Sequence, residues 1–252
     1  MKHGAMTTAC WLGLCLGMVV LRPSIGAGAP ALATQGPGIA YQTWNKPLGV
    51  WQNAAQIDFD LAEMARIGTQ TVRVEFVWNV IEPEMDRFDF TLPDLLVQAA
   101  ERHGIKLYPI IGFQWPPAWM APEHRLASWG TPPKVSSLMN YADPFVRERF
   151  QRVITEVVSH FRGNRTIAAW ILGNEFAYVD FSGFEQLGYD ALSRRQFALW
   201  LKQTYRGREA EFERRWGTPL TTVDTLDPSQ WVIRQDGDVL RAPVIDFLDF
   251  RR

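Results

Sequence analysis

Residues 167–176 read IAAWILGNEF and place an amide and a carboxylate directly after an uncharged, apolar run. A run that is apolar on both faces predicts a strand that is covered on both sides. Glu175 would then follow the carboxyl end of this strand, beside Trp170, Phe176 and Tyr178. Such neighbours would shield the carboxyl from water and raise its pKa, which suits a general acid. An ordinary strand-end glutamate that faces water is the alternative, and this stretch alone does not decide between them.

A second strand is predicted over residues 69–78, TQTVRVEFVW, because β-branched and aromatic residues dominate it. Its side chains alternate between an apolar face and a polar face: Val72, Val74 and Phe76 against Thr71, Arg73 and Glu75. A polar face on a buried strand fits the interior of a barrel near its active site. Arg73 and Glu75 can form a buried ion pair or contact a ligand, and the pattern leaves both readings open.

The elements around these two strands alternate along the chain. Strands are predicted over residues 38–44, 69–78, 105–111 and 167–173, and helices over 57–67, 92–103, 144–161 and 190–205. We expect a long loop over residues 112–142 and a polar, tryptophan-bearing tail from residue 206 onward. Alternating strands and helices predict a parallel sheet with helices outside it.

The N-terminus has the composition of a secretory signal peptide. Lys2 and His3 precede the apolar residues 9–21, and the small residues that follow end in Ala31-Leu32-Ala33. A membrane anchor is the alternative, but a span needs about 20 apolar residues. We therefore expect a signal peptide over residues 1–33 and a mature chain over 34–252. The mature chain would be secreted or periplasmic and not bound to a membrane.

Composition argues against two classes of site. The formal net charge is −1, without a basic stripe, so nucleic acid is not an expected partner. Both cysteines, Cys10 and Cys15, lie in the predicted signal peptide, and the four histidines are widely scattered. No spacing of metal ligands is visible, so we expect neither a metal site nor a cofactor.

Several stretches together carry a resemblance to a known family: VRVEFVWNVIEPEMDRFDF (72–90), GIKLYPIIGFQWPPAWM (104–120), AAWILGNEF (168–176), FALWLKQTYRG and FERRWGTPL. They resemble clan A of the glycoside hydrolases, and most closely the N-terminal catalytic domain of family 42, the β-galactosidase-like enzymes. The resemblance covers roughly residues 38–252. It implies a (β/α)8 TIM barrel that hydrolyses β-glycosides with retention of configuration.

The resemblance also implies roles for individual residues. Glu175 would be the acid/base, Asn174 would contact the sugar 2-hydroxyl, and Arg73 would orient the nucleophile. Retention needs two carboxylates about 5–5.5 Å apart, one protonated and one attacking the anomeric carbon. Aromatic side chains suit the apolar face of a sugar ring, and each candidate can instead be structural: Trp78, Trp115 and Trp119.

The family's second carboxylate does not match this chain. It follows the seventh strand, whereas residues 38–205 supply only four strand-helix units, and a full barrel takes about 250 residues. We therefore expect a truncated or incompletely determined member of the family, the first half of a barrel that is inactive alone. Its open edges invite association, so a homo-oligomer that closes the barrel is the less favoured alternative. Glu75, Glu82 and Asp180 do not lie where the family places its nucleophile.

The substrate class follows from the same resemblance. The expected partner is a small β-glycoside or an oligo- or polysaccharide. Residues 136–141 read SSLMNY where family 42 members often carry Arg-Arg-His-Tyr-Cys, so an arginine for galactose is absent and galactose itself is in doubt. Another clan A specificity, such as a mannosidase or glucanase, stays open. So does a non-catalytic carbohydrate-binding or interaction protein derived from a decayed barrel.

Overall fold

The computed structural model describes residues 20–21, 38–42, 53–113, 115–173, 179–180, 185–232 and 241–251. The chain divides into two compact units. One unit spans residues 18–196 and holds a parallel sheet; the other includes the described residues 197–232 and 241–251. The expectation of a single domain over residues 34–252 stays a prediction.

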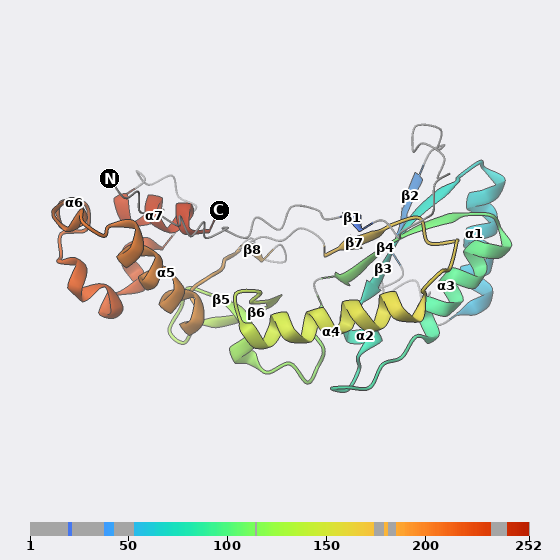
Figure 1. The fold of residues 1–252 in the computed structure, drawn as a ribbon, viewed down its shortest axis with the longest axis horizontal. Coiled ribbons are helices and arrows are strands. Elements are labelled where there is room, and N and C mark those ends of the chain that lie inside the picture. The colour runs from blue at the N-terminus through green and yellow to red at the C-terminus, as the bar shows by residue number, and fades with distance from the viewer. Residues whose placement is uncertain are drawn as a thin grey trace, which may run out of the picture. The chain divides into compact units, whose positions relative to one another are not determined.

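The sheet of the first unit has the strand order β1-β7-β4-β3-β2. Four of its strands run parallel: β2 (Gly38–Tyr41), β3 (Thr71–Val77), β4 (Lys106–Phe113) and β7 (Trp170–Leu172). The two-residue strand β1 (Val20–Leu21) pairs antiparallel with β7 at the outer edge (Figure 1). Parallel neighbours in chain order confirm the predicted fold class, the first part of an α/β barrel.

Helices connect the parallel strands of this unit: α1 (Ala54–Arg66), α2 (Trp78–Ile81), α3 (Thr91–Arg102) and α4 (Pro144–His160). Helix α5 (Ala191–Thr204) begins in this unit, after β7. Helix α1 lies beside α3, and α4 packs against β4 (Figure 1). Asp143 caps α4 by accepting a hydrogen bond from the Phe145 N–H, as its place before Pro144 predicts.

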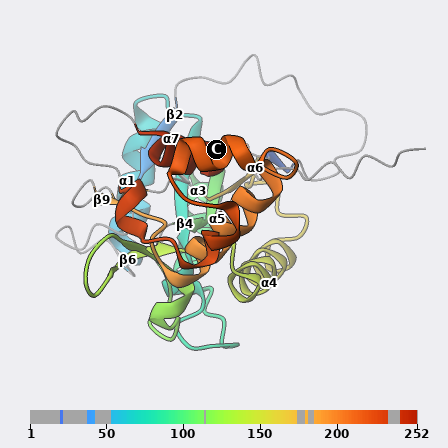
Figure 2. The same ribbon diagram turned by 90° about the vertical axis from the view of Figure 1, so that its left-hand side faces the viewer.

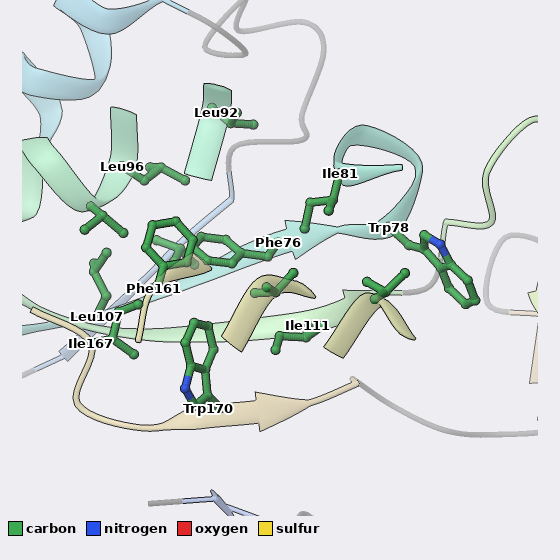
Figure 3. Close-up of a cluster of buried hydrophobic side chains, with 14 of the residues drawn as sticks. Phe76, Trp78, Ile81, Leu92, Leu96, Leu107, Ile111, Phe161, Ile167 and Trp170 are labelled. Carbon is green, nitrogen blue, oxygen red and sulfur yellow. The ribbon is translucent and has the colours of Figure 1, made fainter. Parts of the chain in front are cut away.

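The hydrophobic core lies between one face of the sheet and these helices (Figure 3). Its buried members include Val72, Val74, Phe76, Leu107, Ile111 and Trp170 from the sheet, and Leu92, Leu96, Phe150 and Val153 from the helices. The aromatic rings of Phe76 and Trp170 meet edge to face, with centroids 6.1 Å apart. The predicted apolar face of the second strand is therefore the face that the helices cover.

Residues 112–142 are more ordered than the long loop expected from the sequence. They contain the 3₁₀ helix η3 (Pro122–His124) and the antiparallel strands β5 (Arg125–Ser128) and β6 (Lys134–Met139). A second small antiparallel pair, β8 (Val179–Asp180) with β9 (Glu185–Gln186), follows β7. We call β5, β6 and their turn the β5–β6 hairpin.

The second unit is helical over its described residues. It contains the end of α5, α6 (Glu209–Trp216), η4 (Leu220–Thr225), η5 (Pro228–Trp231) and α7 (Ala242–Phe250). Helix α6 lies beside α7 (Figure 2). The expected polar tail is wrong here, because the helices enclose aromatic rings: Phe197, Phe212, Trp216, Trp231 and Phe247.

One buried carboxylate joins the helices of the second unit. Asp246 on α7 accepts hydrogen bonds from the Tyr205 hydroxyl, the Trp216 indole and the Arg215 guanidinium, at 2.7 to 2.8 Å. These donors replace the water that a buried carboxylate loses. Over the described part of the whole chain, no helix is both long enough and apolar enough to cross a membrane.

Candidate active site

The carboxyl ends of β3, β4 and β7 form the edge of the sheet where an α/β barrel places its site. Strand β7 ends at Leu172, and the next residue, Gly173, has a φ of 69°, in the left-handed region that glycine favours. Its N–H donates to the Ile111 carbonyl of β4 at 2.9 Å. The chain therefore leaves β7 fixed against β4.

Asn174 and Glu175 begin immediately after this anchored glycine. Both lie outside the described residues. Their roles as sugar contact and acid/base stay predictions. The structure shows the strand that precedes them. Strand β7 pairs with β1 on one side and with β4 on the other, and only Gly173 separates its end from Asn174.

The face of the sheet that points away from the helices carries polar side chains. Arg73 on β3 lies in register with Tyr108 on β4, and Glu75 lies in register with Ile110. Glu75 is only 1% exposed and Arg73 is half-buried. Because side chains alternate along a strand, both point opposite to Phe76 and its core. The predicted polar face is therefore present, while the role of Arg73 towards a nucleophile stays a prediction.

Strand β4 bends just before it reaches this edge. The register with β3 shifts between Phe76 and Val77, so that Val77 pairs with Phe113 and Gly112 is the extra residue. Gly112 has a φ of 73°, and a Cβ built on it would overlap the ring of Phe150. A bulge of this kind re-aims the end of a strand, and here only glycine fits it.

Trp78 and Trp119 both bind one glutamate. The Trp78 indole N–H donates to the Glu82 carboxylate at 2.8 Å, and the Trp119 indole N–H donates to the Glu82 carbonyl at 3.0 Å. Trp78 is fully buried, whereas Trp119 is partly exposed. The contacts of Trp78 are those of a core residue. As substrate contacts, both tryptophans stay predictions.

Glu82 is itself the centre of a buried ionic network. Its carboxylate accepts from the Asp86 N–H at 2.9 Å and pairs with the Arg149 guanidinium of α4. Arg149 also donates to the Asp86 carboxylate at 2.8 Å and lies 5.4 Å from the Trp119 ring centroid. The hydrogen bond from Arg149 lowers the pKa of Asp86. A carboxylate held by this many donors fits a structural role better than that of a nucleophile.

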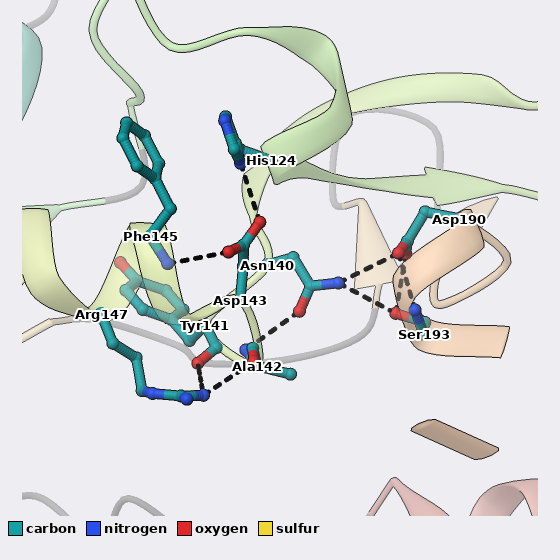
Figure 4. A network of polar contacts seen from close by, with 9 residues as sticks. All are labelled: His124, Asn140, Tyr141, Ala142, Asp143, Phe145, Arg147, Asp190 and Ser193. Atoms are coloured by element: carbon teal, nitrogen blue, oxygen red, sulfur yellow. Dashed lines mark hydrogen bonds and ion pairs between the residues drawn. The ribbon is translucent and has the colours of Figure 1, made fainter. Parts of the chain in front are cut away.

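A second polar network joins the β5–β6 hairpin to the start of α5 (Figure 4). The Asn140 amide donates to the Asp190 carboxylate at 3.0 Å and to the Ser193 hydroxyl at 3.1 Å. Its own oxygen accepts from the Ala142 N–H at 3.0 Å. Both polar atoms of the Asn140 side chain, the nitrogen and the oxygen, therefore contribute to one local structure.

The same figure shows how this region continues into α4. The His124 ring bonds the second oxygen of Asp143 at 2.8 Å and stacks on Phe145, with centroids 4.2 Å apart. Arg147 donates to the Ala142 carbonyl at 2.7 Å. The end of the hairpin and the first turn of α4 are thus one hydrogen-bonded block.

Sequence reasoning missed the residues that build these networks. Arg149 and Asn140 carried no local signal, because their partners lie 67 and 50 residues away along the chain. Asn140 fell in the stretch noted only for lacking the family's arginine and cysteine. Within the described ranges, no three histidine, cysteine or acidic side chains gather as a metal site.

Comparison with known proteins identifies the family of this arrangement. The model of glycoside hydrolase family 42, described as beta-galactosidase, matches residues 48–224. The beta-galactosidase BgaH of Haloferax lucentense is 28% identical over 181 residues, 67% of this chain and 26% of that protein. The beta-galactosidase BbgII of Bifidobacterium bifidum is 26% identical over 205 residues, 77% of this chain and 29% of that protein.

Solved structures show the same fold. A beta-galactosidase from Halorubrum lacusprofundi aligns with a TM-score of 0.62 at 21% identity, over 85% of this chain and 32% of that one. The catalytic domain of a beta-amylase from Paenibacillus polymyxa aligns with a TM-score of 0.57 at 14% identity, over 84% of this chain and 58% of that one. The chain spans about a quarter to a third of the length of the beta-galactosidases that it matches.

Proposed function

Because the chain belongs to glycoside hydrolase family 42, the beta-galactosidase family, we propose that it supplies the proton-donating part of a retaining β-glycosidase site. One observation carries the proposal. The family match spans the parallel strands β3, β4 and β7, and β7 leads through Gly173 directly into Asn174 and Glu175. Carboxylates at this end of a barrel strand are in position for catalysis.

In the proposed reaction, Glu175 protonates the oxygen of the leaving group while a second carboxylate attacks the anomeric carbon. Glu175 then removes a proton from the water that releases the sugar. Asn174 would hold the sugar 2-hydroxyl, and Arg73, on the same face as Glu75, would orient the attacking carboxylate. The family scheme places that second carboxylate after the seventh barrel strand, beyond the four parallel strands described here.

The experiment that tests the proposal is hydrolysis of aryl β-glycosides by the purified protein and by any longer natural form that contains this chain. We compare Glu175→Gln with Glu148→Gln, because Glu148 is an exposed glutamate on α4. Loss of hydrolysis in the first variant alone supports Glu175 as the acid/base. Full activity of Glu175→Gln would overturn that assignment. Sugar binding that survives Glu175→Gln, without hydrolysis by any form, would favour the non-catalytic alternative.

The proposed substrate is a β-glycoside, with a β-galactoside as the first to be tested. The beta-galactosidase relatives favour galactose, whereas the SSLMNY stretch lacks the arginine that the family resemblance leads one to expect. Asn140 of this stretch is buried in the network that joins the hairpin to α5. A panel of aryl β-galactoside, β-glucoside and β-mannoside separates these specificities.

We also propose that the protein is exported and that residues 1–33 are its signal peptide. The support is the order of Lys2, the apolar residues 9–21 and the small residues that end at Ala33. N-terminal sequencing of the protein recovered from its native host tests this proposal. A mature chain that begins at residue 34 is the expected result.

A further inference from the structure

The connection that leaves β7 is anchored at both of its ends. It begins at Gly173, whose N–H is bonded to β4. Its far end lies on the β5–β6 hairpin: Leu187 forms an antiparallel bridge with Ser128, and the Tyr189 N–H donates to the Ala127 carbonyl at 3.0 Å. Between these ends, β8 and β9 pair with each other. The hairpin therefore determines where this connection returns to the fold.

Asn140 completes this second anchor. Asp190 directly follows Tyr189, and its carboxylate accepts from the Asn140 amide, from the Ser193 N–H and from the Ser193 hydroxyl. Asn140, Asp190 and Ser193 are 1%, 9% and 2% exposed. Water therefore cannot readily replace a bond that is lost, and an unpaired polar group in this place is costly.

We propose that the β5–β6 hairpin is a positioning element for the connection after β7, and that Asn140 is the positioning residue that locks the two together. The residue acts through Asp190, whose backbone lies beside the paired Tyr189. Asn140 is suited to this role because one amide donates to two acceptors and accepts from a third group, Ala142 N–H. The link to catalysis rests on the proposed function of Glu175, which lies in the same connection. The anchor itself is independent of that proposed function.

Two substitutions of Asn140 test the anchor. Asn140→Asp removes the donor and places a second carboxylate about 3 Å from Asp190, so the two repel each other. Asn140→Ala removes the three hydrogen bonds of the Asn140 side chain without adding a charge. This variant replaces Asn140→Asp in the experiment if Asn140→Asp does not fold.

Amide hydrogen exchange of the full chain is the measurement. We expect exchange to accelerate roughly tenfold or more in residues 125–142 and 185–190 of the single variants, because local opening becomes easier. Exchange over β3 and α3 should stay unchanged. A general loss of stability would instead accelerate exchange in all of these segments.

Two results would overturn the proposal. One is unchanged exchange at residues 185–190 in Asn140→Ala or Asn140→Asp. The other is an acceleration that is as large over β3 and α3 as at residues 185–190. Asn164→Asp is the matched control, because the Asn164 side chain accepts a bond from the Thr166 N–H, and a carboxylate accepts it equally well.

Catalysis provides a separate readout in a form of the protein that hydrolyses aryl glycosides. A displaced proton donor lowers kcat for poor leaving groups more than for activated ones, whereas a smaller folded fraction lowers both equally. We expect the first pattern for Asn140→Ala. If no form hydrolyses glycosides, the proposed function fails while the exchange experiment still decides whether the anchor exists.

Discussion

The guanidinium of Arg149 and the carboxylate of Glu82 form a buried ion pair that joins the segment after β3 to α4. Glu82 has no exposed surface, and Arg149 has little. Trp78 bonds the Glu82 carboxylate, and Trp119 bonds its carbonyl while its ring lies near the Arg149 guanidinium. This pair therefore supports two of the three tryptophans that the sequence singles out.

Glu82→Gln should lower the free energy of unfolding by about 3 kcal/mol, because removal of one partner leaves a buried charge poorly compensated. Urea denaturation followed by tryptophan fluorescence measures the change. The control is Glu84→Gln, which breaks the exposed pair of Glu84 with Arg87 and should cost about 1 kcal/mol or less. Equal losses in the two variants would contradict the importance of burial.

Gly112→Ala should destabilise the fold by roughly 2–5 kcal/mol, the sum of a left-handed backbone and an overlap with Phe150. Gly104→Ala is the matched control. Gly104 has a similar φ of 68°, but a Cβ there would meet no atom within 4 Å, so only the backbone cost of about 1–2 kcal/mol remains. Thermal or urea unfolding compares the two. If Gly104→Ala cost as much, steric contact with Phe150 would not be the reason.

Tyr205 predicts a loss of stability in alkaline solution. Burial, followed by the hydrogen bond to Asp246, raises the pKa of Tyr205 from about 10 to about 12. The folded state thus holds the proton more tightly than the unfolded state. The contribution of Tyr205 to the free energy of unfolding is fully present below pH 10 and is lost as the pH rises towards 12.

Ultraviolet titration of tyrosinate, combined with denaturation at each pH, measures this effect. Tyr205→Phe should remove one late-titrating tyrosine and flatten the stability profile between pH 10 and 12. A Tyr205 that titrates near pH 10 in the folded protein would contradict the bond to Asp246.

Glu175→Ala should slow hydrolysis of substrates with poor leaving groups by about 10²- to 10⁴-fold, the usual contribution of a general acid. Activated aryl leaving groups need little protonation, so the rate of the glycosylation step should fall much less for substrates that carry them. Steady-state kinetics over a series of aryl glycosides of graded leaving-group pKa measures the difference. Equal loss across the series would refute a role for Glu175 as the proton donor.

The local sequence pattern predicted the sheet because each strand carries its own signal. The alternation of Val72, Val74 and Phe76 with Arg73 and Glu75 depends only on the two faces of one strand. The apolar run 167–173 likewise depends only on burial. Both patterns are local, so no knowledge of the partner strands was needed to assign faces to them.

The features that the sequence did not predict depend on distant partners. The β5–β6 hairpin consists of short strands. Leu187 and Tyr189, which pair with this hairpin, lie about 60 residues further along the chain. Phe197 and Phe247 meet at 5.1 Å between ring centroids although 50 residues separate them. No periodicity within one element reveals such contacts.

Strand β1 has a consequence for the maturation of the protein. Its residues, Val20 and Leu21, belong to the segment proposed to be removed on export, and they occupy the outer hydrogen-bonding side of β7. If cleavage follows Ala33, the mature protein lacks β1, and the backbone groups of β7 that bond β1 become available to another strand.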